Sequence, residues 1–96
     1  MTSDMFKENL QYAPFPDHMK KSIEAYVNRG RPMGGFLTAL FANDLMKACS
    51  RADEINITLI ADYARFMYNS CPAGCVGSYK NVATWLGLDR LEEGEK

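Results

Sequence analysis

The residues with the clearest capacity for chemistry lie in a glycine-rich loop that is predicted to run into a helix. This loop extends from Arg29 to Phe36 and also contains Arg31, Gly34 and Gly35. Glycine lets a backbone approach a partner closely, and the first turn of a helix has unpaired N–H groups. Arginine side chains bind phosphate groups through paired hydrogen bonds. The combination predicts a cradle for an anion.

A second glycine-rich loop contains Gly77 and Ser78 before another predicted helix, with Lys80 two residues further on. Aromatic rings near both loops can stack on a base, so the two loops together predict a site for a nucleotide-type ligand. The candidate ligand-binding residues are Arg29, Arg31, Gly34, Gly35, Phe36, Gly77, Ser78 and Lys80. The alternative interpretation is that the glycines only permit tight turns between helices.

The cysteines and the single histidine do not form a recognisable metal or catalytic motif. Cys71 and Cys75 are separated by three residues, and no second pair completes a structural zinc pattern. Ser78 lacks the Gly-x-Ser-x-Gly pattern of a hydrolase nucleophile, and no serine or cysteine near His18 in sequence marks a nucleophile. We therefore expect no metal, no cofactor and no enzymatic activity.

Composition sets the class of protein. The chain has 96 residues, a formal net charge of −1 and an apolar fraction of 47%, which is typical of one small globular domain. The charge argues against a nucleic-acid partner. No apolar run is long enough to span a membrane, and no leader sequence precedes the cysteines, so we expect a cytoplasmic protein with reduced thiols and no membrane partner.

The spacing of apolar residues predicts four helices and no sheet, which is an all-α compact bundle. The predicted helices are 16–28, 35–51, 56–70 and 78–87, with Gly30 ending the first, Asn56 capping the third and Ser78 capping the fourth.

Around these helices we expect an N-terminal arm over residues 1–14, a single helical domain over 15–87 and an acidic tail over 88–96. The predicted core residues are Ile23, Val27, Leu37, Leu40, Phe41, Leu45, Ile60, Tyr63, Met67 and Trp85. The apolar face of 35–51 is wider than one small bundle needs, which favours a homo-oligomer that uses the helices 35–51 and 56–70.

Several short motifs resemble a loose family of small phage- and prophage-encoded proteins of uncharacterised function. The motifs are Gly35-Phe-Leu-Thr-Ala-Leu-Phe-Ala-Asn-Asp-Leu45, Arg51-Ala-Asp53, Asn56, Tyr68-Asn-Ser-Cys-Pro72, Gly77-Ser78 and Trp85. The resemblance covers about residues 13–87 and departs at Cys75-Val-Gly-Ser78, where related proteins tend to show Cys-Trp-Gly-Ser. It implies a viral accessory protein of the host cytoplasm and transfers no catalytic residue.

Two functions are compatible with these features. The first is a non-enzymatic binder that sequesters a phosphorylated small molecule, such as a nucleotide signal of host immunity. The alternative is a protein inhibitor or adaptor that docks on a host defence or regulatory complex through an exposed helix face. The glycine loops favour the first function, and the acidic tail and the wide apolar face favour the second.

Overall fold

The chain is helical throughout the part that the computed structural model describes, which is the backbone of residues 4–94 and the side chains of residues 5–86. No strand occurs within that part, so the prediction of an all-α fold is confirmed. The elements are α1 (Asp4–Tyr12), α2 (Asp17–Arg29), α3 (Gly35–Phe41), α4 (Leu45–Arg51), α5 (Glu54–Ile57), α6 (Ile60–Ser70), a 3-10 turn η1 (Ala73–Cys75) and α7 (Tyr79–Gly94). Residues 4–94 thus form seven α-helices, where the sequence predicts four.

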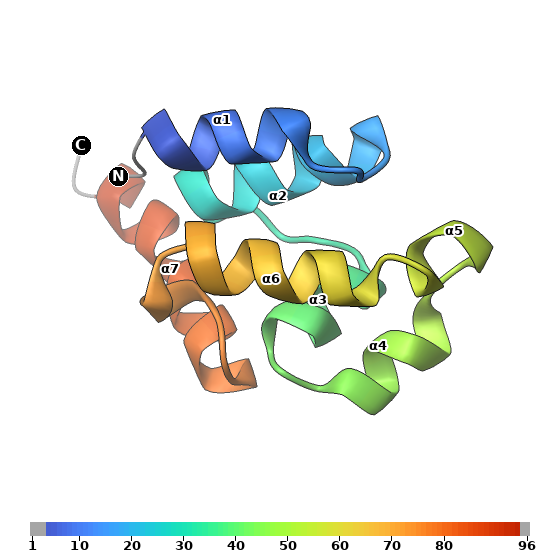
Figure 1. The fold of residues 1–96 in the computed structure, drawn as a ribbon. Helices are drawn as coiled ribbons and strands as arrows, with labels where there is room; N and C mark the ends of the chain where they lie inside the picture. Colours follow the sequence, from blue (N-terminus) through green and yellow to red (C-terminus); the bar gives the residue numbers. More distant parts are fainter. Residues whose placement is uncertain (1–3, 95–96) are drawn as a thin grey trace.

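The helices are arranged around a central aromatic core. Figure 1 shows α1 and α2 together on one side, α6 beneath α1, and α3 and α4 on the opposite side. Contacts join α1 to α6 and α2, and α7 packs against both α2 and α3. The four-residue α5 lies at one end of the molecule, beyond α4 (Figure 1).

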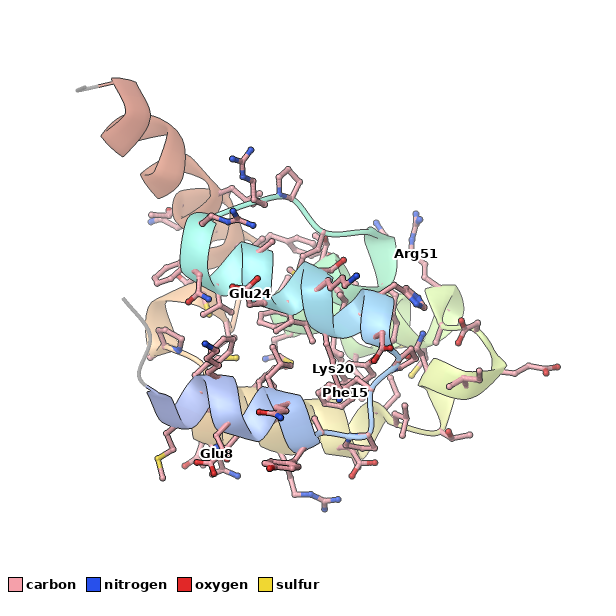
Figure 2. All side chains as sticks on the ribbon, turned by 90° about the horizontal axis from the view of Figure 1, so that it is seen from above. Glu8, Phe15, Lys20, Glu24 and Arg51 are labelled. Carbon is pink, nitrogen blue, oxygen red and sulfur yellow. The ribbon has the colours of Figure 1, made fainter. Side chains whose placement is uncertain are left out.

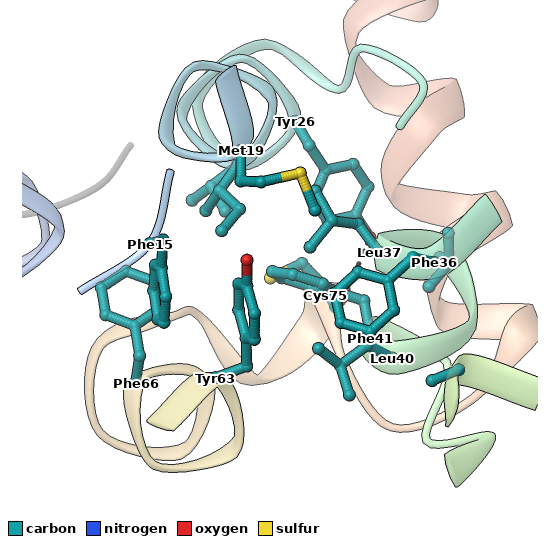
Figure 3. Close-up of a cluster of buried hydrophobic side chains, with 14 of the residues drawn as sticks. Phe15, Met19, Tyr26, Phe36, Leu37, Leu40, Phe41, Tyr63, Phe66 and Cys75 are labelled. Atoms are coloured by element: carbon teal, nitrogen blue, oxygen red, sulfur yellow. Dashed lines mark hydrogen bonds between the residues drawn. The ribbon is translucent and has the colours of Figure 1, made fainter. Parts of the chain in front are cut away.

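The core is built from rings that meet at Tyr63 of α6. Its ring stacks on Phe15 with centroids 4.0 Å apart and meets Phe36 of α3 edge-on at 5.4 Å (Figure 3). Offset and edge-on ring pairs of this kind add to the stabilisation that burial provides. Six of the predicted core residues are buried, namely Ile23, Val27, Leu37, Leu40, Phe41 and Tyr63. Ile60, Met67 and Trp85 are half-buried against this core, whereas Leu45 is 56% exposed, so its prediction as a core residue is wrong.

The N-terminal residues differ most from expectation, because Asp4–Tyr12 of the predicted arm form the helix α1. Phe6 and Leu10, one helical turn apart, are both buried. Asn9 of α1 also donates a hydrogen bond to the Ser70 hydroxyl of α6, with a distance of 2.8 Å. Burial of this short apolar pair fixes the segment; residues 1–3 lie outside the described range.

The predicted helix 35–51 is interrupted, and two short helices, α3 and α4, take its place. Asn43 adopts φ 63°, a left-handed conformation that asparagine tolerates better than most residues. Asp44 then caps α4, because its carboxylate accepts a hydrogen bond from the N–H of Lys47 at 3.3 Å. The wide apolar face of 35–51 reflects two helices with different orientations.

The predicted helix 56–70 also begins differently, with α5 before α6 and Asp53 as the capping residue. The Asp53 carboxylate accepts from the N–H of Asn56 at 2.7 Å, so the prediction of Asn56 as the cap is wrong. Asn56 is buried, and its side-chain oxygen accepts from the Tyr63 hydroxyl at 2.6 Å.

The last helix begins as predicted and continues past its predicted end. Ser78 caps α7 by accepting from the N–H of Asn81 at 3.0 Å. The helix runs to Gly94, so Gly87 does not end it and residues 88–94 of the predicted tail have a helical backbone. The remaining tail residues, 95 and 96, lie outside the described range.

Candidate functional site

The basic glycine loop connects α2 to α3 in an extended conformation. Gly30 ends α2 with φ 65° and ψ 30°, as predicted, and Gly34 precedes α3 with an extended backbone. Figure 2 shows Arg51, from the end of α4, beside the α3 end of this loop. A Cβ atom on Gly35 would lie only 2.9 Å from Nη1 and 3.0 Å from Cδ of Arg51. The close approach that Gly35 permits is therefore that of an arginine of the same chain.

Three arginines border this loop, and none of them has a carboxylate partner among the described side chains. Arg29, Arg31 and Arg51 are all exposed. Among the described residues the ion pair that forms is the one between Arg65 and Asp62 on α6. The loop therefore presents cationic groups to solvent, and one of them, Arg51, is not among the candidate residues that the sequence predicts.

The aromatic residues expected near the loop pack in the core. Phe36 is buried against Tyr63, so its ring does not face solvent. Tyr26 is also fully buried, and its hydroxyl donates to the carbonyl of Cys75 at 2.7 Å. Burial raises the pKa of Tyr26 above its ordinary value. Neither ring is placed to stack on a ligand in the described structure.

The second glycine loop lies at the other end of α3. The N–H of Gly77 donates to the carbonyl of Phe41, the last residue of α3, at 2.8 Å, and Gly77 has φ 108°. Gly34 and Gly35 stand at the opposite end of this seven-residue helix, about 10 Å away. Ser78 is committed to capping α7, and Lys80 is exposed. The predicted site residues therefore form two separate groups.

The two cysteines before this loop form a structural turn. Cys75 is buried, and its thiol donates to the carbonyl of Pro72 at 3.1 Å. A hydrogen bond with Cys75 and burial both raise the pKa of the Cys71 thiol. No cluster of three or more His, Cys, Asp and Glu side chains suited to a metal ion occurs within the described residues.

One concave surface is an apolar groove that sequence reasoning did not predict. It has a volume of about 340 Å³ and lies between α3, the start of α4, α6 and the segment before α7. Figure 1 shows these elements around one side of the molecule. The residues that line the groove are Leu40, Phe41, Asn43, Leu45, Ile60, Ala64, Met67, Tyr68, Val76 and Gly77. None of them is Asp, Glu, Lys, Arg or His, and only Asn43 and Tyr68 have polar side-chain atoms.

Large apolar side chains at the edge of this groove remain in solvent. Tyr68 is 89% exposed and Leu45 is 56% exposed, although both line the groove. A signal for one wall was present in the sequence, because Ile60, Ala64, Met67 and Tyr68 recur at the spacing of one helical stripe. The opposite wall depends on the break at Asn43, which no periodic pattern predicts.

A hydrogen bond between α7 and the residue before α4 fixes the α4 side of the groove. The Tyr79 hydroxyl of α7 donates to the Asp44 carboxylate at 2.6 Å. This bond and the N–H of Lys47 lower the pKa of Asp44, whereas the pKa of Tyr79 is raised by the same carboxylate. Together with the bond between Gly77 and Phe41, it holds the segment before α7 against the turn between α3 and α4.

Comparison with known proteins supplies no function for this arrangement of residues. The chain matches no protein-family model, no curated protein and no solved structure. The resemblance to phage-encoded proteins therefore stays a prediction. Within the described residues, no helix has the length and apolar character that crossing a membrane requires.

Proposed function

We propose that this chain acts by binding another protein and not by catalysis, and that the apolar groove is its binding surface. The observation that carries the proposal is the groove itself, with ten lining residues of which none is charged. A surface without His, Asp, Glu, Lys or Cys lacks the commonest general acids and bases. The same surface suits the desolvated centre of a protein interface, where charged residues are depleted and tyrosine is enriched.

The energetic argument comes from the apolar side chains of the groove that remain exposed to water. Tyr68 and Leu45 both line the groove and are both large and exposed. Together they present on the order of 300 Å² of side-chain surface, given that one aromatic side chain can bury about 150–250 Å². Covering apolar surface releases about 25 cal/mol per Å², so a partner that covers these side chains gains binding energy from the contact.

A selection experiment tests this proposal with a defined probe. Peptides designed as amphipathic helices would be displayed and selected against the wild-type chain, and the dissociation constant of each binder measured. Ala64 is exposed at the middle of the α6 wall, so Ala64→Arg places a charge in the groove without burying it. We expect at least tenfold weaker binding to Ala64→Arg.

The matched control is Ala83→Arg, because Ala83 is an exposed helical alanine that does not line the groove. This variant should bind the selected peptides as the wild type does. Binders that tolerate both substitutions equally would contradict the proposal.

A second candidate function, the capture of a nucleotide-type anion at the loop between α2 and α3, is favoured by the position of Arg51. Its guanidinium group lies against Gly35, close to the start of α3, and Arg31 is exposed on the same loop. Two guanidinium groups that pair with no carboxylate within the described part of the chain suit the phosphates of a ligand. The phosphorylated ligand implied by the resemblance to phage proteins belongs to this class.

Melting temperatures measured with a panel of nucleotides and cyclic nucleotides test this second function. A ligand that binds only the folded state raises the melting temperature, and the rise should shrink in Arg51→Ala and Arg31→Ala. Lys21→Ala, which removes an exposed cation from α2, is the control. The absence of a rise with every compound, or an equal rise in all variants, would refute the second function.

A further inference from the structure

We propose that the occupant of the apolar groove is the same groove of a second copy of this chain, with Tyr68 of each copy seated in its partner. This inference rests on the proposed function and names the partner. It follows from three properties of the groove: its lack of charge, the position of its small residues and the presence of its own protruding ring.

The first property is the absence of charged residues. In a symmetric dimer, the surface near the two-fold axis meets an identical surface, so any charge there faces a like charge. Lysine, arginine, aspartate and glutamate are all missing from the ten residues that line the groove. A hydrophobic surface of this kind avoids self-repulsion, so it is compatible with a symmetric contact between two identical copies.

The second property is a stretch of α6 where another backbone can approach. Ala61 and Ala64 are both exposed, and Ala64 lies at the middle of the groove wall that α6 forms. Small side chains allow two helices to pack at the short end of the usual 8–10 Å range. A two-fold axis beside Ala64 would set the two copies of α6 antiparallel.

The third property is the complementarity that this axis creates. About an axis at residue 64, residue 68 of one copy faces residue 60 of the other, since each is four positions away. Tyr68 is the most exposed large side chain of the groove, and Ile60 is half-buried in the groove wall. By the same rule, Met67 faces Ala61, so a long side chain meets a small one. Each copy therefore supplies both a protruding ring and the hollow that receives it.

The exposed area at the groove sets the expected strength of the dimer. Tyr68 and Leu45, the exposed large side chains of the lining, supply on the order of 300 Å² per copy. A stable interface of standard size buries about 800 Å² per partner, so this contact belongs to the class of small interfaces that associate weakly. The dimer should therefore form as the concentration of the chain is raised.

The experiment places opposite charges at residue 64, which lies on the proposed two-fold axis. Ala64→Arg and Ala64→Glu would be prepared separately, together with the wild type, and their masses measured by light scattering over a range of concentrations. The wild type should have twice the monomer mass of 10.8 kDa. Each variant alone should be a monomer, because its charge faces an identical charge, with a dimer dissociation constant raised at least tenfold.

A mixture of Ala64→Arg and Ala64→Glu should restore the dimer, because the two charges then face each other. This result cannot come from misfolded variants or from an interface elsewhere on the molecule. The Ala83→Arg variant should remain a dimer. A wild type that stays at 10.8 kDa up to about millimolar concentration, or variants that dimerise unmixed, would overturn the inference.

The failure of this inference is distinguishable from a failure of the proposed function. If the wild type is a monomer and helical peptides still lose affinity for Ala64→Arg, the groove binds a different protein. If the peptides do not respond to Ala64→Arg either, the groove is not an interaction surface.

Discussion

Tyr63 tests the packing of the core at the scale of one residue, because its hydroxyl group is buried with a single acceptor. It donates to the side-chain oxygen of Asn56, which is buried as well. Tyr63→Phe keeps the ring between Phe15 and Phe36 but leaves the Asn56 oxygen unpaired. Leaving a buried polar atom without a partner costs about 1–3 kcal/mol.

Urea denaturation of Tyr63→Phe should therefore show a free energy of unfolding lower by that amount. The control is Tyr12→Phe, because Tyr12 is largely exposed, and it should stay within about 0.5 kcal/mol of the wild type. Equal unfolding midpoints for Tyr63→Phe and the wild type would show that this hydrogen bond does not stabilise the core.

Asp44 connects a single residue to the pH dependence of stability. The Tyr79 hydroxyl is the main cause of its lowered pKa, and the N–H of Lys47 adds to the effect. Because the folded-state pKa lies below the unfolded value of about 3.9, the ionised carboxylate stabilises the fold above that pH. This contribution is lost as the pH falls through the folded-state pKa.

An NMR titration of the Asp44 carboxyl carbon in the wild type and in Tyr79→Phe checks this assignment. The variant removes the strongest hydrogen bond, so the pKa of Asp44 should rise toward its ordinary value. Tyr12→Phe should leave it unchanged. An Asp44 pKa that is identical in Tyr79→Phe and the wild type would exclude Tyr79 as the cause.

Local signals in the sequence predict several residue roles correctly. Gly30 ends α2 and Ser78 caps α7, because glycine in a left-handed conformation and serine before a helix act through their immediate neighbours. Asn56 resembles a cap equally well, yet its side chain turns inward to Tyr63, seven residues away. The position of Arg51 over Gly35 depends on the packing of α4 against α3, which local sequence does not specify.

At the scale of elements, α1 is the helix that most needs a test, because the sequence analysis predicts an arm over these residues. Phe6 is buried and meets Phe66 of α6 with ring centroids 5.7 Å apart. Phe6→Ala removes a buried ring and should lower the free energy of unfolding by about 3–5 kcal/mol. Met5→Ala, one residue earlier and exposed, should change it by less than about 0.5 kcal/mol.

Thermal or urea unfolding of the two variants gives the comparison. Such a loss is a large fraction of the 5–15 kcal/mol that a domain of this size typically has. A cost for Phe6→Ala as small as that for Met5→Ala would mean that residues 4–12 are an arm outside the core, as the sequence predicts.

The helices that sequence reasoning located well are those with one continuous apolar stripe. In α2, Met19, Ile23, Tyr26 and Val27 are all buried, and the observed bounds differ from the predicted ones by one residue at each end. The prediction of one helix over 35–51 is wrong because the apolar residues on the two sides of the turn together have the spacing of a single helix. The turn is set by Asn43 and Asp44, whose short polar side chains outweigh that pattern.

At the scale of the whole molecule, the interrupted helices explain why the groove exists. A continuous helix over 35–51 would carry Leu45 along the same axis as Leu40. The turn at Asn43 instead sends α4 in a new direction and leaves Leu45 in solvent at the groove's edge. The wide apolar face from which the sequence predicts a homo-oligomer is thus the origin of both the groove and its exposed rim.

An isotope-filtered NOE experiment on a sample that mixes labelled and unlabelled wild-type chains tests directly whether the groove binds a second copy of this chain. It detects only contacts between copies. We expect intermolecular cross-peaks from the Tyr68 ring to the Ile60 methyl groups and from Met67 to Ala61. Intermolecular peaks confined to α1 and α2, or none at millimolar concentration, would contradict the claim that the groove receives a second copy of this chain.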